Sequence, residues 1–293
     1  MVTMSNTLKK RNLFGGLYTV PAMILLIMLL IVPLGYTLYC SLFPFKYMMR
    51  GSFQGLNNFI EILKSPRIQY SFYITFIVTF SATAISIVVG LLLALWIDKR
   101  TGLFAYWIQL IGLIPWVISM VVAGLLWRWL FNVDLGLFNV IIRAFGWNTI
   151  DVVNKRIPAI IGLIFVMSWR TIGYAMVMIL AGLKGIDADL IEAAQIDGAS
   201  PVQTLFRIKL PIIKSSVLLS TIVLTVSNFT NNTVPKVLTG GGPVNATNVV
   251  TLEQYNLSFV YYEFGRSSAL SILIMIVTIL IIAAYIKVAK FEI

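Results

Sequence analysis

The 293-residue sequence contains no histidine and only one cysteine, Cys40. Histidine is the commonest general base and a common metal ligand, so its absence removes the usual route to acid–base catalysis and to a metal centre. A lone cysteine excludes disulfide frameworks and CxxC metal sites, and Cys40 fits a small buried packing residue. The sequence therefore predicts no catalytic residues and no metal site.

Charged residues are scarce as well, at 11% of the chain, whereas hydrophobic residues make up 59%. A soluble domain carries about 25% charged residues, so this chain cannot cover its own surface with polar groups and needs lipid to cover it. The formal net charge is +11. The basic residues are scattered between apolar runs rather than gathered in a patch with aromatic residues, which argues against a nucleic-acid partner.

Six stretches reach the length of about 20 mostly apolar residues that a helix needs to cross a bilayer. Their apolar runs are continuous rather than alternating, which favours helices over barrel strands. The predicted spans are residues 17–42, 71–97, 104–126, 157–183, 215–235 and 267–286. The predicted fold class is therefore all-α: an integral membrane bundle of six transmembrane helices, forming one domain over residues 1–293.

Six spans place both termini on the same side of the membrane. The Lys and Arg residues outside the spans divide almost evenly between the two sides, so the positive-inside rule does not decide the orientation. The basic cluster Lys9–Arg11 ahead of the first span favours a cytoplasmic N-terminus.

The loop of residues 184–214 is polar and yet has the pattern of two short helices. The first is predicted at about residues 188–196 and ends at Gly198, a residue suited to positive φ just past a helix. The second begins with Ser200 as N-cap and Gln203 three residues later, which forms a capping box. On these local features alone, an amphipathic helix–turn–helix lying on the membrane surface fits as well.

The spacing within this loop resembles the one shared by permease subunits of binding-protein-dependent ABC importers. That pattern is Glu-Ala-Ala, three residues, Gly, nine residues and Ile-x-Leu-Pro. The matching positions are Glu192, Ala193, Ala194, Gly198, Ile208, Leu210 and Pro211. In that family the loop is cytoplasmic and docks in a cleft of the ATPase subunit. The resemblance implies an inner-membrane protein with both termini in the cytoplasm, and an ATPase-coupling set that also includes Asp197 and Ser200.

Other segments look like the MalF/UgpA type of these permeases. They are Pro115-Trp116 and the runs 126–131 and 237–243. The resemblance implies an ABC importer type I permease (MetI-like) fold and a solute that is a sugar, an oligosaccharide or a related polyol or glycerol-phosphate compound. It also implies three partners: a MalG-type permease in a heterodimer, two copies of a cytoplasmic ATPase, and an extracytoplasmic solute-binding protein.

The glycine run within residues 237–243 lacks the Gly-Lys-Ser/Thr ending of a P-loop. The chain itself is therefore expected to bind no ATP and to be no enzyme. ATP and Mg²⁺ would belong to the separate ATPase.

Polar residues inside predicted spans are candidates for the solute pathway, because such residues are costly in lipid and usually face a cavity or another helix. Four recur on one face of the fifth span, and three more are a central arginine in the fourth span and two aromatic residues near it. They are Thr221, Thr225, Asn228 and Asn232, and Trp169, Arg170 and Tyr174. The alternative for the stripe is packing between helices. Arg170 could contact solute, gate the pathway or hold the bundle together.

An ion-coupled secondary transporter or channel is the alternative function. Such proteins normally need acidic residues within the membrane, and the six predicted spans contain no Asp or Glu. A membrane enzyme is disfavoured because no nucleophile stands beside a base.

Overall fold

The computed structural model describes residues 20–100 and 102–289. The basic cluster Lys9–Arg11 and residues 17–19 of the first predicted span lie outside the described residues. The chain divides into two compact units. One comprises Met1–Lys64 and Leu257–Leu273, and the other comprises Ser65–Asn256 and Ile274–Ile293. One transmembrane domain over residues 1–293 stays a prediction.

The first unit combines apolar helices with a short hairpin. Its N-terminal helical run is Val20–Ser41, in which η1 is a π-helix (Ile27–Ile31) and α2 is Val32–Ser41; β1 (Phe45–Lys46), β2 (Met49–Arg50) and α3 (Asn57–Lys64) follow. Tyr47 and Met48 join the two strands at positive φ of 49° and 63°, as a two-residue hairpin turn requires. The hairpin is held by an ion pair of 2.9 Å between Lys46 and Glu263.

Glu263 is partly buried and lies just before the helix α15. Its burial opposes ionisation, but the hydrogen bond from Lys46 and the charges of Arg266 and Lys46 outweigh that effect and lower the pKa of the carboxyl. The carboxylate therefore stays ionised and keeps both cations beside it. Arg266 reaches it at 2.8 Å.

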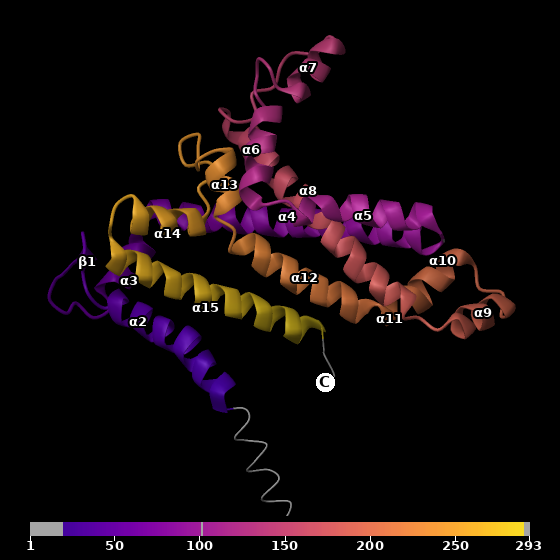
Figure 1. Cartoon of the computed structure of the whole chain (residues 1–293), viewed down its shortest axis with the longest axis horizontal. Coiled ribbons are helices and arrows are strands. Elements are labelled where there is room, and N and C mark those ends of the chain that lie inside the picture. The colour runs from indigo at the N-terminus through magenta and orange to yellow at the C-terminus, as the bar shows by residue number, and fades with distance from the viewer. Residues whose placement is uncertain (1–19, 101, 290–293) are drawn as a thin grey trace, which may run out of the picture. The chain divides into compact units, whose positions relative to one another are not determined.

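The second unit holds most of the helices (Figure 1). They are α4 (Pro66–Asp98), α5 (Leu103–Val117), α6 (Met120–Leu130), α7 (Leu137–Ala144), α8 (Arg156–Lys184), α9 (Ala188–Ile196), α10 (Pro201–Thr204), η2 (Leu205–Lys209), α11 (Leu210–Ile212), α12 (Lys214–Phe229) and α13 (Thr233–Leu238). Helices α14 (Val250–Phe259) and α15 (Phe264–Ala289) contribute residues to both units.

Helices α4 and α8 form the centre of the second unit, and α5 and α12 pack against α8. Their contact is built from fully buried apolar side chains, among them Val78 of α4 and Leu163 and Val166 of α8. A second apolar cluster joins the far ends of the same helices, where Ile97 and Ile179 meet Ile213. These contacts fix the end of α4 beside the segment that leads into α12.

Small residues let the helix backbones approach closely. A β-carbon on Gly173 of α8 would lie 1.8 Å from the carbonyl oxygen of Gly112 in α5, so these two backbones are in direct contact. A β-carbon on Gly90 of α4 would lie 2.7 Å from the Cβ of Ala175. Such close packing at small residues is typical of helix pairs in membranes.

The apolar stretch predicted as one span at 104–126 is two helices in the structure. Helices α5 and α6 meet at 95°, because Ile118 and Ser119 take extended conformations between them. The interruption comes three residues after Pro115, whose ring removes one helical hydrogen bond and crowds the preceding turn. A proline in a membrane helix therefore marks a full change of direction here.

The stretch predicted at 215–235 is interrupted as well. Helix α12 ends at Phe229, and α13 begins at Thr233 after three polar residues. Asn231 accepts a hydrogen bond of 3.0 Å from the backbone N–H of Val234 and so starts the new helix.

The described residues contain four helices long and apolar enough to cross a membrane, or up to six if each of two bent helix pairs is one span. The bent pairs are α5 with α6, and α10–α11 with α12. The count of six crossings stays a prediction.

Candidate functional site

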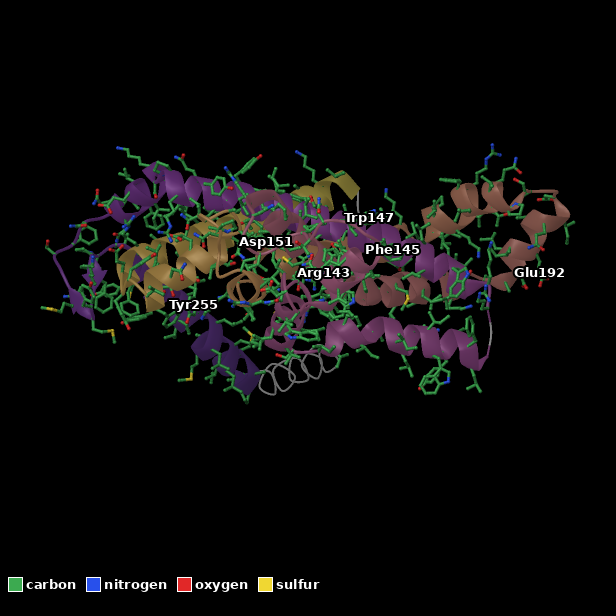
Figure 2. The ribbon with its side chains drawn as sticks, turned by 90° about the horizontal axis from the view of Figure 1, so that it is seen from above. Arg143, Phe145, Trp147, Asp151, Glu192 and Tyr255 are labelled. Carbon is green, nitrogen blue, oxygen red and sulfur yellow. The ribbon has the colours of Figure 1, made fainter. Side chains whose placement is uncertain are left out.

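The polar loop between α8 and α12 begins with the helix α9. Asp187 precedes α9, and its side chain accepts a hydrogen bond of 3.1 Å from the backbone N–H of Asp189. This cap satisfies one of the free donors at the start of the helix. Figure 1 shows α9 beyond the ends of α5, α8 and α12, and Glu192, labelled in Figure 2, is exposed. Ala194 is buried, so the side of α9 that carries it faces the rest of the protein.

A bend separates α9 from α10. Gly198 has a φ of +76°, a conformation that side chains with a β-carbon rarely adopt, and this residue ends α9. Ser200 and Gln203 then exchange two hydrogen bonds: the Ser200 N–H donates to Gln203 Oε1 at 2.8 Å, and the Gln203 N–H donates to Ser200 Oγ at 3.3 Å. The capping box is therefore present, and together with Gly198 it fixes the angle between the two helices.

The end of the loop packs onto the helix bundle. Ile208 and Leu210 are partly buried, and Leu210 packs against the cluster that contains Ile97 and Ile213. Pro211 lies in α11 and is exposed. Residues 208–211 thus join the outer helix α9 to the membrane helix α12.

Ion pairs connect this loop to two long helices. Asp98, the last residue of α4, forms two ion pairs. Its carboxylate oxygens lie 2.6 Å from Nζ of Lys209 in η2 and 3.2 Å from Nζ of Lys184 at the end of α8. One carboxylate therefore holds three elements together. This cluster could not be predicted from the sequence, because residues 98, 184 and 209 are far apart along the chain. The only available signal was that Asp98 and Lys184 each directly follow a predicted span.

Three of the four polar residues predicted to form a stripe on the fifth span lie in one helix, α12. Asn228 is buried, and its amide donates a 3.1 Å hydrogen bond to the hydroxyl of Thr83 on α4. Thr225 is fully buried, 3.1 Å from the hydroxyl of Tyr285. Thr221 is partly buried and bonds to the carbonyl of Val217 in its own helix. The stripe thus contributes contacts between helices as well as polar groups.

Asn232 departs from this pattern because it lies beyond the end of α12. Its side chain accepts a 3.1 Å hydrogen bond from the hydroxyl of Thr233. The helical spacing used to place it on the same face as Thr221 and Asn228 therefore does not reach it. The structure does not group Asn232 with the other three on one helix face.

Arg170 lies near the middle of α8 and is 8% exposed. Its guanidinium group stands 5.2 Å from the ring centroid of Trp116 and donates a long hydrogen bond, 3.4 Å, to the carbonyl of the same residue. Tyr174 stacks on Trp116 at 4.6 Å. Arg170 and Tyr174 therefore converge on the C-terminal end of α5.

Trp169 belongs to a separate aromatic group. Its ring meets Trp127 of α6 edge-on at a centroid distance of 5.3 Å. The structure therefore brings Arg170 and Tyr174 together and directs Trp169 to another helix.

The predicted solute pathway includes Asn228, and on that prediction its replacement by leucine raises the KM of solute uptake by about three- to tenfold, which corresponds to the loss of one neutral hydrogen bond. The amount of assembled protein should stay near wild type, because leucine fills a similar volume. Uptake kinetics in membrane vesicles measure this effect. Thr230→Val is the matched control, since Thr230 is exposed at the C-cap of α12 and its hydroxyl donates to the carbonyl of Val226, one turn earlier. An unchanged KM with a lower yield of protein would assign Asn228 to packing.

Long apolar helices, broken at two places and joined by a helical polar loop, define a multi-pass membrane protein. Residues 86–290 match the family described as the binding-protein-dependent transport system inner membrane component, and the chain belongs to this family. The family predicted from the loop spacing is confirmed.

The chain is similar to permeases of known transport systems along most of its length. The trehalose/maltose transport system permease protein MalF of Thermococcus litoralis is 30% identical over 282 residues, which cover 95% of this chain and 94% of that protein. The sn-glycerol-3-phosphate transport system permease protein UgpA of Yersinia enterocolitica is 33% identical over 233 residues, covering 79% of this chain and 78% of that protein.

The fold is also found among solved structures. A chain in the crystal structure of a bacterial ABC transporter involved in the import of the acidic polysaccharide alginate gives a TM-score of 0.83, with 19% identity and 96% of each chain covered. This likeness confirms the predicted all-α membrane permease fold.

Proposed function

We propose that this chain is the permease subunit that passes a sugar, an oligosaccharide or a related polyol or glycerol-phosphate solute through the membrane, driven by ATP hydrolysis in a separate protein. The observation that carries the proposal is the loop. Helix α9, the Gly198 bend and the capping box form a unit of fixed geometry that projects from the helix bundle. The solute class rests on relatives whose names specify trehalose, maltose and sn-glycerol-3-phosphate transport.

The loop has the physical properties of a coupling element. The Glu192 carboxylate is exposed and forms no ion pair with a described residue, so it is available to a partner protein. The ATPase would meet the exposed part of α9 and the bend, with the predicted coupling residues Glu192, Ala193, Asp197, Gly198 and Ser200. The sixth predicted coupling residue of this part of the loop, Ala194, is buried and would support the contact from behind. A movement of the ATPase would displace this loop. The segment with Ile208, Leu210 and Pro211 would pass the displacement to α12, and the ion pairs of Asp98 would pass it to α4 and α8.

The proposed assembly contains this chain, a MalG-type permease, two copies of the ATPase and an extracytoplasmic solute-binding protein. The loop faces the cytoplasm, which places both termini of the chain there. ATP and Mg²⁺ bind to the ATPase copies. We place the solute pathway along Thr221, Thr225, Asn228 and Asn232, with Trp169, Arg170 and Tyr174 beside it, and we assign Arg170 a structural or gating role because its only described partners are groups of Trp116.

Affinity purification of the tagged chain from native membranes tests the proposal. We expect one related permease and two ATPase copies per tagged chain, with ATP-dependent uptake after reconstitution together with the binding protein. Recovery of the chain alone, still moving solute without ATP, would instead favour an ion-coupled carrier. The solute-binding protein of the system can then be screened against sugars and glycerol phosphates to identify the solute.

A further inference from the structure

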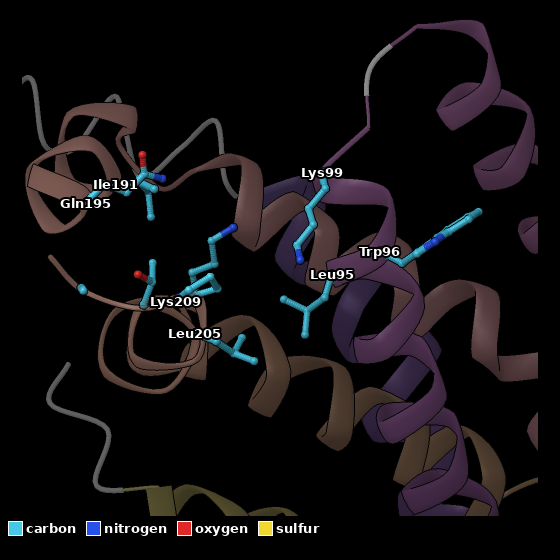
Figure 3. Close-up of a pocket in the computed structure, with 10 residues that line it drawn as sticks. Leu95, Trp96, Lys99, Ile191, Gln195, Leu205 and Lys209 are labelled. Carbon is cyan, nitrogen blue, oxygen red and sulfur yellow. The ribbon is translucent and has the colours of Figure 1, made fainter.

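A cavity of about 720 Å³ lies between the end of α4 and the helices of the polar loop (Figure 3). The last turns of α4 form one wall, α9 forms the second, and the segment from α10 to η2 forms the third. The lining side chains that matter here are Leu95, Lys99, Ile191, Gln195, Leu205 and Lys209. None of the nine predicted ATPase-coupling residues lines this cavity, so it is a site distinct from the coupling motif.

The cavity has an excess of positive charge. Its two charged lining residues, Lys99 and Lys209, are both lysines, and Figure 3 shows their amino groups turned toward the same space. Asp98 is the carboxylate bound to Lys209, but it is shared with Lys184. Lys99 is exposed and forms no ion pair with a described residue. Like charges that line one space repel each other, so the cavity favours an anion.

The remaining lining is largely apolar. Leu95, Ile191 and Leu205 contribute aliphatic side chains to the three walls. A soluble anion such as phosphate gains nothing from these groups, whereas the burial of a hydrocarbon chain against them is favourable. The ligand that fits both features is an amphiphile with an anionic head group.

The position of the cavity points to the lipid bilayer as the source. Leu95 and Lys99 lie at the end of α4, which is apolar and long enough to cross a membrane. Beside them the guanidinium group of Arg100 stands 4.2 Å from the ring centroid of Trp96. Tryptophan and basic residues are enriched where membrane helices leave the hydrocarbon. The opening of the cavity therefore lies at head-group depth.

We propose that an anionic phospholipid of the adjacent leaflet binds in this cavity, with its phosphate between Lys99 and Lys209 and an acyl chain along Leu95 and Leu205. Basic pockets between membrane helices are known to select anionic head groups. Because the walls belong to α4, α9 and η2, the bound lipid stiffens the joint between the loop and the bundle. The regulatory consequence rests on the proposed function: anionic lipid raises the ATP-driven activity of the transporter.

Native mass spectrometry of the complete purified transporter tests lipid binding without any transport assay. The probes are a phosphatidylglycerol and a phosphatidylcholine with the same acyl chains. We expect phosphatidylglycerol to bind preferentially, and Lys99→Gln to weaken its binding by about fivefold, the effect of one basic residue at a membrane surface. Lys99→Arg should restore binding. The matched control is Arg207→Gln, which removes an exposed charge from η2, the helix that carries Lys209, at a position outside the cavity lining, and should leave binding unchanged.

Three results would overturn the site. They are equal binding of the two lipids, an equal effect of Lys99→Gln and Arg207→Gln, and displacement of the lipid by glycerol 3-phosphate at equal concentration, which would assign the cavity to a soluble anion. If the lipid binds only after the ATPase is stripped away, the ATPase itself covers the cavity. Failure of ATP-dependent uptake with lipid binding intact would count against the proposed function alone.

Discussion

Replacement of Gly173 by alanine is expected to prevent α5 from packing on α8 and to lower the yield of folded protein sharply. The added β-carbon would lie 1.8 Å from the carbonyl oxygen of Gly112 and 2.6 Å from its carbonyl carbon. Both contacts are with backbone atoms, which cannot rotate away as a side chain can. Overpacking of a tight contact costs about 1–3 kcal/mol or more, and here a whole helix has to move.

Thermal melting and size-exclusion profiles of detergent-extracted protein measure this effect. The matched control is Gly35→Ala in α2, another glycine within an apolar helix, where an added β-carbon meets no atom within 4 Å. We expect Gly35→Ala to behave like wild type, and Gly173→Leu to be worse than Gly173→Ala. Equal melting temperatures for the two alanine variants would mean that α5 and α8 are not in backbone contact.

The substitution Glu192→Lys is expected to remove the ATPase from the purified complex while the chain itself stays folded in the membrane. The carboxylate is exposed and forms no ion pair with a described residue, so its replacement leaves no buried group unsatisfied within the chain. At an interface the loss of one charged partner costs about 2 kcal/mol or more, which weakens binding roughly thirtyfold. Reversal of the charge adds repulsion to this loss.

Quantified co-purification and ATP-driven uptake provide the two measurements for Glu192. Asp189→Lys is the matched control, because it makes the same change of charge on an exposed residue of the same helix, outside the predicted coupling set. We expect it to retain most of the bound ATPase. Full ATPase binding and uptake by Glu192→Lys would remove the coupling role assigned to this residue.

Features set by neighbours along the chain could be predicted from the sequence. The bounds of α9 at 188–196, the positive φ of Gly198 and the capping box of Ser200 and Gln203 all agree with the expectation. Each follows from a few adjacent residues, since caps and bends depend on local hydrogen bonds and on the absence of a β-carbon.

Features that depend on distant residues could not be predicted in the same way. The pairing of Asp98 with Lys209 joins residues 111 positions apart, and the hydrogen bond between Asn228 and Thr83 spans 145 positions. A hydropathy pattern also does not reveal short interruptions of a helix. The extended residues Ile118 and Ser119 are hidden within an apolar run, and the end of α12 at Phe229 removes Asn232 from its expected face. Only Pro115 and the polar residues after Phe229 signalled these breaks.

The direct contact between Gly112 and Gly173 restricts how the protein can move. Where α5 and α8 touch through backbone atoms, no flexible side chain lies between them to absorb sliding, so we expect these two helices to move together. The extended joint at Ile118 and Ser119 connects this pair to α6. Ile118 closes the last turn of α5 and Ser119 opens the first turn of α6, and the non-helical torsions of these two residues make the joint the expected hinge for any movement of α6 relative to α5.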